Sequence, residues 1–221
     1  LLPPFYWSGA DSQHGPRLVD VAGDDFAGLQ AVLMRSCVVA TLGVGQADRS
    51  TRYNNLQLVS ARRIEHAGRW QEYAATRLAV VKRKAAVTPL GDTPKIPFGD
   101  EAVVRRAMLE GRANELYLFH GTTPQIVPLV VHGGFDERVS SIRGLFGGGI
   151  YFALNASKSD QYCTPDGGGL YSIFLSRVTV GEPFRTSVSR AGERRPPLGR
   201  TASLGRRPRT STWSSCRTTA G

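Results

Sequence analysis

Between residues 113 and 163 the sequence alternates short apolar runs with clusters of glycine. Each apolar run ends in polar or aromatic residues, as at His120-Gly121-Thr122, and the longest glycine cluster is the triplet at 147–149. Glycine allows positive φ and lets the backbone approach a flat ligand closely. A chain built in this way places polar groups at the ends of strands around a cleft, and we expect its functional site within this stretch.

Length and composition indicate one globular domain with irregular ends. A chain of 221 residues can bury roughly 70% of the surface that its unfolded form exposes, and 41% hydrophobic residues are typical of a globular protein. The three cysteines are far apart and include no C-x-x-C pair, so we predict neither disulfides nor a metal site. Neither a signal peptide nor a membrane-spanning run is apparent. We therefore expect an intracellular protein, nuclear or cytoplasmic, with no membrane partner.

The basic charge of the chain is concentrated at its C-terminal end. Residues 190–221 contain eight arginines and a single acid, Glu193, and so carry +7 of the formal net charge of +10. Such a tail can attract phosphate backbones but has no means of reading a sequence. We expect nucleic acid as a partner only through this tail. The tail alone also supports a separate interpretation of the chain, as a basic protein associated with nucleic acid.

Apolar spacing predicts helices and strands in alternation up to about residue 185. The residues Thr123 and Pro124 are a good helix start, although Pro128 would interrupt that helix. The run 170–180 is apolar on both faces and predicts a central strand. From residue 186 onward Arg, Ser, Thr and Pro dominate, and we predict disorder. Helices are expected to begin near residues 24, 69, 100, 123 and 155, and strands to lie at 53–64, 116–119, 150–153 and 170–180.

Five sequence pieces, in one order from residue 114 to residue 181, resemble the catalytic domain of the poly(ADP-ribose) polymerase family, closest to its tankyrase-like branch. They are Asn114-Glu115-x-x-Leu118-Phe119-His120-Gly121-Thr122, Gly134-Phe135-Asp136, Gly147-x-Gly149-Ile150-Tyr151-Phe152-Ala153, Ser157-Lys158-Ser159 with Tyr162, and Arg177-Val178-Thr179-x-Gly181. The resemblance covers roughly residues 24–184. It implies an α+β ADP-ribosyltransferase-like fold, with antiparallel sheets around an NAD-binding cleft and an incomplete C-terminus. The expected organisation is an irregular segment at 1–23, the domain at 24–185 and a disordered basic tail at 186–221.

The resemblance also implies an activity. Members of this family transfer ADP-ribose from NAD⁺ to a protein acceptor, as single units or as polymers, and release nicotinamide. NAD⁺ is therefore the expected cosubstrate, a protein the expected acceptor and nicotinamide the leaving group. Cleavage of the glycosidic bond needs the leaving group held in orientation and stabilisation of the ribosyl cation that forms beside it.

By likeness to the family, His120 and Tyr151 would be the catalytic residues. His120 would hydrogen-bond a ribose hydroxyl on the adenosine side, and Tyr151 would pack beneath the nicotinamide end. The backbone of Gly121 and the hydroxyl of Ser159 would hold the nicotinamide amide, and Tyr162 would stack on the ring. The glycine-rich stretch from 133 to 149 would be the donor loop. The full set expected to bind NAD⁺ is His120, Gly121, Thr122, Tyr151, Ser159 and Tyr162.

The family's catalytic acid has no counterpart here. The only acids after Asp166 are Glu182 and Glu193, and neither lies in the matching context. This absence favours an alternative, a non-catalytic module that binds NAD⁺ or ADP-ribose. Since the family continues with core strands where this chain loses its apolar periodicity, we also hypothesise that the sequence from about residue 186 is a frame-shifted translation.

Overall fold

The computed structural model describes residues 2–8, 15–44, 53–83, 87–91, 101, 108–141, 143–193, 200 and 202–205. The strands are β1 (Arg17–Asp20), β2 (Arg62–Glu65), β3 (Glu115–Gly121), β4 (Ile173–Thr179), β5 (Pro183–Thr186) and β6 (Ala202–Gly205). The α-helices are α1 (Gly23–Arg35), α2 (Ala67–Arg83), α4 (Val127–Gly133) and α5 (Ala156–Asp160), and the 3₁₀ turns are η1 (Val39–Thr41), η2 (Gly111–Ala113) and η3 (Glu137–Val139). Within this part of the chain the strands form three small sheets of two strands each. The prediction of a mixed α+β fold is confirmed.

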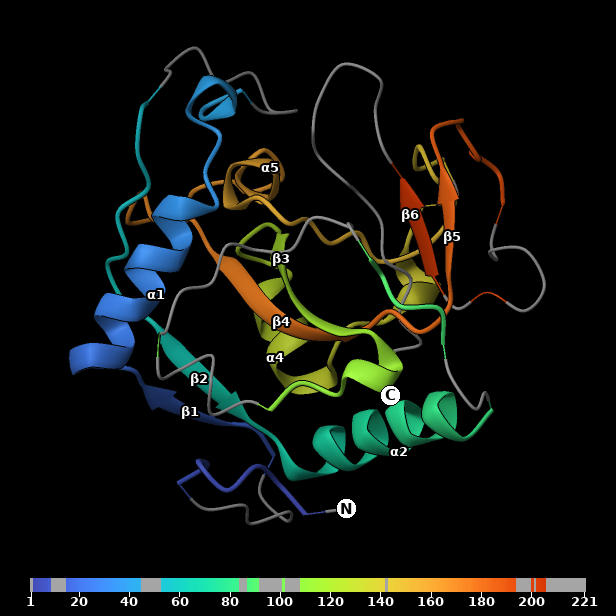
Figure 1. Ribbon diagram of the computed structural model, residues 1–221. Helices are drawn as coiled ribbons and strands as arrows, with labels where there is room; N and C mark the ends of the chain where they lie inside the picture. The colour runs from blue at the N-terminus through green and yellow to red at the C-terminus, as the bar shows by residue number, and fades with distance from the viewer. Residues whose placement is uncertain are drawn as a thin grey trace.

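Strands β3 and β4 form the longest sheet. They run antiparallel, with Glu115 opposite Thr179 at one end and Gly121 opposite Ile173 at the other. Their inward side chains pack with the segment 150–156 to build the hydrophobic core. This pair crosses the middle of the molecule (Figure 1). The last residues of β3 therefore emerge from the core at a fixed position.

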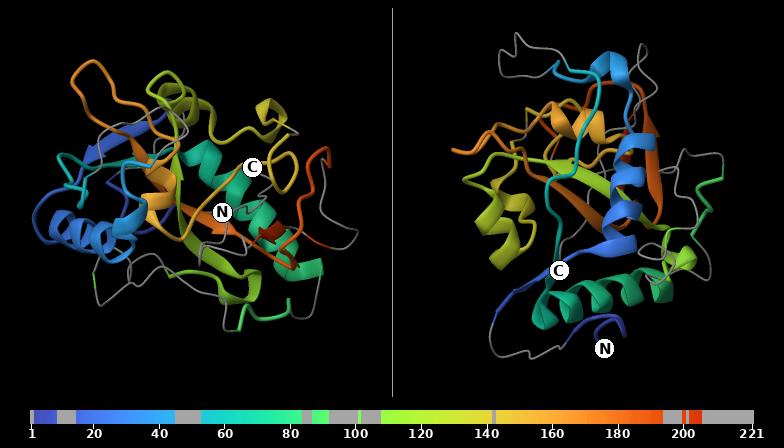
Figure 2. Two further views of the ribbon diagram at one scale, coloured as in Figure 1. Left: turned by 90° about the horizontal axis from the view of Figure 1, so that it is seen from above. Right: turned by 90° about the vertical axis from the view of Figure 1, so that its left-hand side faces the viewer.

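Helices α1 and α2 lie at the periphery, apart from each other, and their axes point in different directions (Figure 1 and the right-hand view of Figure 2). Each is amphipathic: α1 buries Val32, and α2 buries Ala67 and Ala74. The last turn of α2 contains Lys82 and Arg83, which suit the negative end of the helix dipole. Both helices begin within two residues of the positions that apolar spacing predicted.

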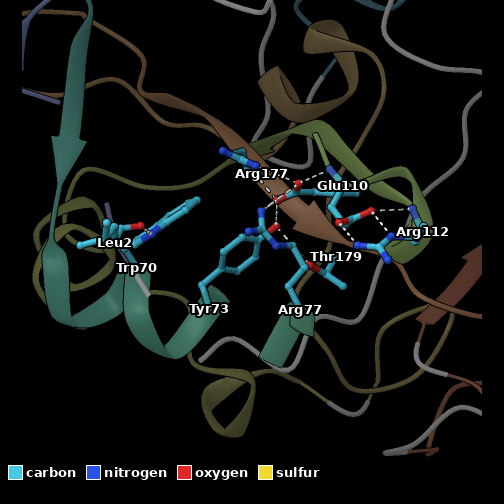
Figure 3. A network of polar contacts seen from close by, with 9 residues as sticks. Leu2, Trp70, Tyr73, Arg77, Glu110, Arg112, Arg177 and Thr179 are labelled. Carbon is cyan, nitrogen blue, oxygen red and sulfur yellow. Dashed lines mark hydrogen bonds and ion pairs between the residues drawn. The ribbon is translucent and has the colours of Figure 1, made fainter. Parts of the chain in front are cut away.

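A buried carboxylate connects α2 with the β3–β4 pair. Glu115 has a fully buried side chain that accepts a hydrogen bond from the Tyr73 hydroxyl at 2.6 Å. Arg177 and Arg77 both pair with it, at 2.8 and 3.1 Å, and the Glu110 N–H donates to it at 2.7 Å (Figure 3). Burial alone would raise the pKa of Glu115, but the hydrogen bonds and charge of Arg177, with the Tyr73 and Glu110 donors, bring that pKa below its ordinary value. The carboxylate is therefore ionised inside the protein.

The strand predicted at 53–64 is confined to its C-terminal end, in β2. The side chain of Gln30 on α1 accepts from the N–H of Leu58 at 2.5 Å and donates to the carbonyl of Leu56 at 3.1 Å. These backbone groups are thus satisfied by α1 and take no part in a ladder. The alternation of apolar residues correctly indicated extended chain, but the ladder begins only at Arg62.

Two further expectations are corrected. The segment 150–153 forms only an isolated bridge, Phe119 to Ala153, because the carbonyl of Tyr151 is occupied by His120. The strand predicted at 170–180 is confirmed as β4, but among the described residues it has β3 as its single ladder partner, so the expected central position is not found there. The helix predicted near residue 100 lies outside the described residues.

Pro128 does not interrupt a helix, because α4 begins later than predicted. Backbone N–H groups of Ile126 and Val127 bond back to the carbonyl of Thr123, which forms a turn before the helix. Pro128 then lies in the first turn of α4, where its missing N–H costs nothing.

Part of the segment predicted to be disordered has a regular structure. Strand β6 pairs in parallel with β5, with Pro183 opposite Ala202 and Thr186 opposite Gly205. Residues 187–193 also have defined contacts, whereas 206–221 lie outside the described residues. The domain limits 24–185 stay a prediction. No helix in the described ranges is both long and apolar enough to cross a membrane.

Candidate functional site

The end of β3 lies directly against α5. A β-carbon built on Gly121 would lie 1.9 Å from the carbonyl oxygen of Ser159 and 2.8 Å from the sulfur of Cys163. Real side chains do not approach this closely, so only glycine fits at position 121. The structure therefore brings together Gly121 and Ser159, two of the residues expected to bind the nicotinamide amide.

His120 has a defined tautomer. Its Nδ1 lies 2.8 Å from the backbone oxygen of Tyr151. Because a carbonyl can only accept, Nδ1 carries the proton, and the neutral ring presents Nε2 as an acceptor. Burial lowers the pKa of His120, and the Tyr151 carbonyl opposes this shift only in part. Phe135 and Phe152 surround the ring, with centroids at 4.9 and 5.6 Å. His120 is thus a neutral, oriented hydrogen-bond acceptor at neutral pH.

Tyr151 holds the glycine-rich loop (residues 143–149) through its hydroxyl. Its hydroxyl donates to the carbonyl of Gly147 at 2.6 Å and accepts from the N–H of Phe146 at 3.0 Å. Burial raises the pKa of the Tyr151 phenol, so the hydroxyl keeps its proton. A β-carbon on Gly144 would lie 2.2 Å from this hydroxyl, so the loop closes tightly around it. Tyr151 thus connects the loop with His120.

Helix α5 supplies the remaining residues of the site. Ser159 is buried, whereas Tyr162, just past the helix, is 38% exposed. The ammonium group of Lys158 lies 5.1 Å from the Tyr162 ring. The helix is anchored through Ser157, which accepts from the N–H of Val38 at 2.9 Å. Tyr162 therefore presents an accessible ring just after Ser159, to whose carbonyl its N–H donates at 3.0 Å.

Five of the six expected residues are linked in one cluster: His120, Gly121, Tyr151, Ser159 and Tyr162. Thr122 directly follows Gly121 on the chain and is 8% exposed. Sequence reasoning did not single out Cys163 or Gly144, although both shape the cluster. Gly144 was one glycine among many, and nothing in the sequence marked Cys163 as a neighbour of Gly121. Among the described residues no group of three or more potential metal ligands occurs.

The two acids after Asp166 both pair with arginines. Glu182 is buried, accepts from the N–H of Thr88 at 2.9 Å and pairs with Arg200 at 2.6 Å. Glu193 pairs with Arg190. The structure thus gives both carboxylates other partners.

Residues 41–216 match the family of the poly(ADP-ribose) polymerase catalytic domain. The match covers most of the chain. The chain belongs to this family. Membership implies NAD⁺ as the substrate, ADP-ribosyl transfer as the reaction class and a protein as the acceptor.

Three relatives indicate which branch of the family this chain is similar to. The chain is 39% identical over 77 residues to human protein mono-ADP-ribosyltransferase PARP12, 43% over 79 residues to human PARP11 and 39% over 71 residues to human PARP14. These segments make up 34%, 34% and 31% of this chain, and 11%, 23% and 4% of the respective relatives. The chain thus spans less than a quarter of each relative. The expected tankyrase-like branch is wrong, because these relatives are mono-ADP-ribosyltransferases.

Proposed function

We propose that this polymerase-family domain binds NAD⁺ beside the end of β3 and transfers single ADP-ribose units to a protein acceptor. The observation that carries the proposal is the joining of Gly121, Ser159 and Tyr162 with a neutral His120 in one cluster. The names of the relatives support transfer of single units. The matched segments cover only part of each relative's length.

The residues of the cluster suit the nicotinamide end of NAD⁺ and the ribose on its adenosine side. The backbone of Gly121 and the hydroxyl of Ser159 offer complementary groups to a carboxamide, and the exposed ring of Tyr162 offers a stacking surface. His120 offers Nε2 to a ribose hydroxyl, while Tyr151 fixes the loop nearby. Such positioning places the glycosidic bond for cleavage, an effect that can lower the barrier by several kcal/mol.

The pairing of Glu182 and Glu193, the acids after Asp166, with arginines limits the choice of acceptor. Extension of a polymer requires activation of a ribose hydroxyl, for which a general base is needed. A carboxylate side chain of an acceptor protein is already a nucleophile and needs no such base. The domain would therefore add one unit to an acidic acceptor residue and would not extend it.

A second candidate function is binding of NAD⁺ without transfer. The observation that favours it is the engagement of both Glu182 and Glu193 elsewhere. Binding and transfer separate in one experiment, in which calorimetry measures NAD⁺ affinity and chromatography measures nicotinamide release from the same samples. Both signals are expected for transfer, whereas binding alone would favour the second function.

A matched pair of tyrosine variants tests the site itself. Tyr162→Ala is expected to weaken NAD⁺ binding by about 1 kcal/mol, roughly fivefold, through lost stacking. Tyr171→Ala, which removes a ring of similar exposure (42%) from the neighbouring loop, should leave binding unchanged. Equal affinities of both variants would contradict the assignment of Tyr162.

A further inference from the structure

A short turn beyond the expected domain limit docks on the glycine-rich loop. The N–H of Arg190 donates to the carbonyl of Leu145 at 2.8 Å, and the N–H of Gly148 donates to the carbonyl of Glu193 at 2.7 Å. A β-carbon on Gly147, where φ is +89°, would lie 2.4 Å from the same carbonyl of Glu193. The approach is therefore closer than any residue other than glycine would allow.

This turn has its own internal supports. The N–H of Glu193 donates back to the carbonyl of Arg190 at 3.1 Å, and the guanidinium Nε of Arg190 donates to the Glu193 carboxylate at 2.8 Å. The same guanidinium lies 4.8 Å from the ring centroid of Phe184 on β5. The turn is thus fixed to the body of the protein before it meets the loop.

The glycine-rich loop is consequently held by two segments. Tyr151 bonds to Phe146 and Gly147, and residues 187–193, which we name the brace, bond to Leu145 and Gly148. A loop with four glycines gains much backbone freedom when such bonds are absent. Each of these hydrogen bonds therefore restricts the loop to fewer conformations.

We infer that the brace holds the glycine-rich loop in the conformation that receives NAD⁺, so that Arg190 and Glu193 are positioning residues for the dinucleotide. This inference rests on the proposed function, in which the loop lies over NAD⁺. It assigns a role in the site to a segment that sequence analysis placed in the tail. A loop fixed before binding loses less conformational entropy when the ligand arrives, which favours affinity.

The test uses two proline variants of the full chain. Arg190→Pro removes the N–H that bonds to Leu145, whereas Ser189→Pro introduces proline one residue earlier, outside both docking bonds. Amide hydrogen exchange of residues 143–149 without ligand is measured first, followed by NAD⁺ affinity by calorimetry. Thermal unfolding verifies that each variant is folded. Should Arg190→Pro not fold, Arg190→Ala keeps the N–H but removes the ion pair and the ring contact, and should act in the same direction.

We expect Arg190→Pro to speed exchange in the loop and to weaken NAD⁺ binding, each by about five- to tenfold, with Ser189→Pro close to wild type. If amide exchange in the loop were the same in folded Arg190→Pro and in Ser189→Pro, the inference that the brace restrains the loop would be overturned. Faster exchange with unchanged NAD⁺ affinity would overturn the positioning role. A wild-type protein that binds no NAD⁺ would contradict the proposed function instead, and the exchange data would still decide whether the brace exists.

Discussion

At the scale of single residues, we propose that the protonation of His120 determines what the site can bind. Its Nδ1–H is committed to the Tyr151 carbonyl, so ligand recognition depends on an unprotonated Nε2. Burial lowers the His120 pKa below 6.5, and protonation would convert the acceptor into a donor. We predict that NAD⁺ affinity is constant above about pH 6.5 and falls as the pH is lowered further.

Calorimetry between about pH 5 and pH 8 checks this prediction. His120→Gln is the control, because glutamine can also accept a hydrogen bond but does not titrate. Its affinity should change little over the same range. A wild-type profile as flat as that of the control would contradict the role of His120 as an acceptor.

The close contact of Gly121 with α5 makes a second prediction at this scale. Gly121→Ala forces a methyl group against Ser159 and Cys163, and we expect a loss of about 1–3 kcal/mol in unfolding free energy together with loss of NAD⁺ binding. Gly133→Ala is the matched control, since a β-carbon there meets nothing within 4 Å. Urea denaturation compares the two. If Gly121→Ala were as stable as the control, the strand and helix would not be packed as described.

At the scale of elements, Glu115 decides how α2 is attached to the β3–β4 pair. Glu115→Gln removes the charge that Arg77 and Arg177 share, and we predict a loss of about 3 kcal/mol in unfolding free energy. Glu72→Gln, which breaks an exposed ion pair with Arg69, should cost about 0.5 kcal/mol or less. Equal losses in urea denaturation would show that the buried network contributes nothing specific.

The same network gives a dependence of stability on pH. The folded-state pKa of Glu115 lies below the value of 4.5 that an unperturbed glutamate has. Its contribution is therefore fully present above that value, and it is lost as the pH falls through the folded-state pKa. Glu115→Gln should remove this part of the acid-induced loss of stability.

Elements with local signals could be predicted from the sequence, whereas those set by distant partners could not. The periodicity of α1 and α2 is contained in each helix, and both were located correctly. The segment around Leu56 and Leu58 looked like a strand, but the side chain of Gln30 satisfies its backbone groups. Nothing local distinguishes these two outcomes.

The site shows the same division. The ordered motif pieces located His120, Gly121, Tyr151, Ser159 and Tyr162, because family resemblance preserves order and spacing. The strand β6 and the brace escaped detection, since their backbone bonds depend on segments far away in the sequence and their composition resembles that of a disordered tail. Composition alone cannot reveal such distant hydrogen-bond partners.

At the scale of the whole molecule, we propose that this polymerase-family domain transfers single ADP-ribose units from NAD⁺. The family match supports the reaction class, and the relatives support single transfer. The engagement of Glu182 and Glu193 explains why polymer extension is not expected.

The intact mass of the full chain after incubation with NAD⁺ and an acidic acceptor protein tests this claim most directly, with His120→Ala alongside. We predict discrete additions of one ADP-ribose unit per modified site, with fewer additions in the variant. Ladders of many units on single sites would contradict single transfer. No addition, although NAD⁺ still protects the protein against heat, would show that the domain binds the dinucleotide without transferring ADP-ribose.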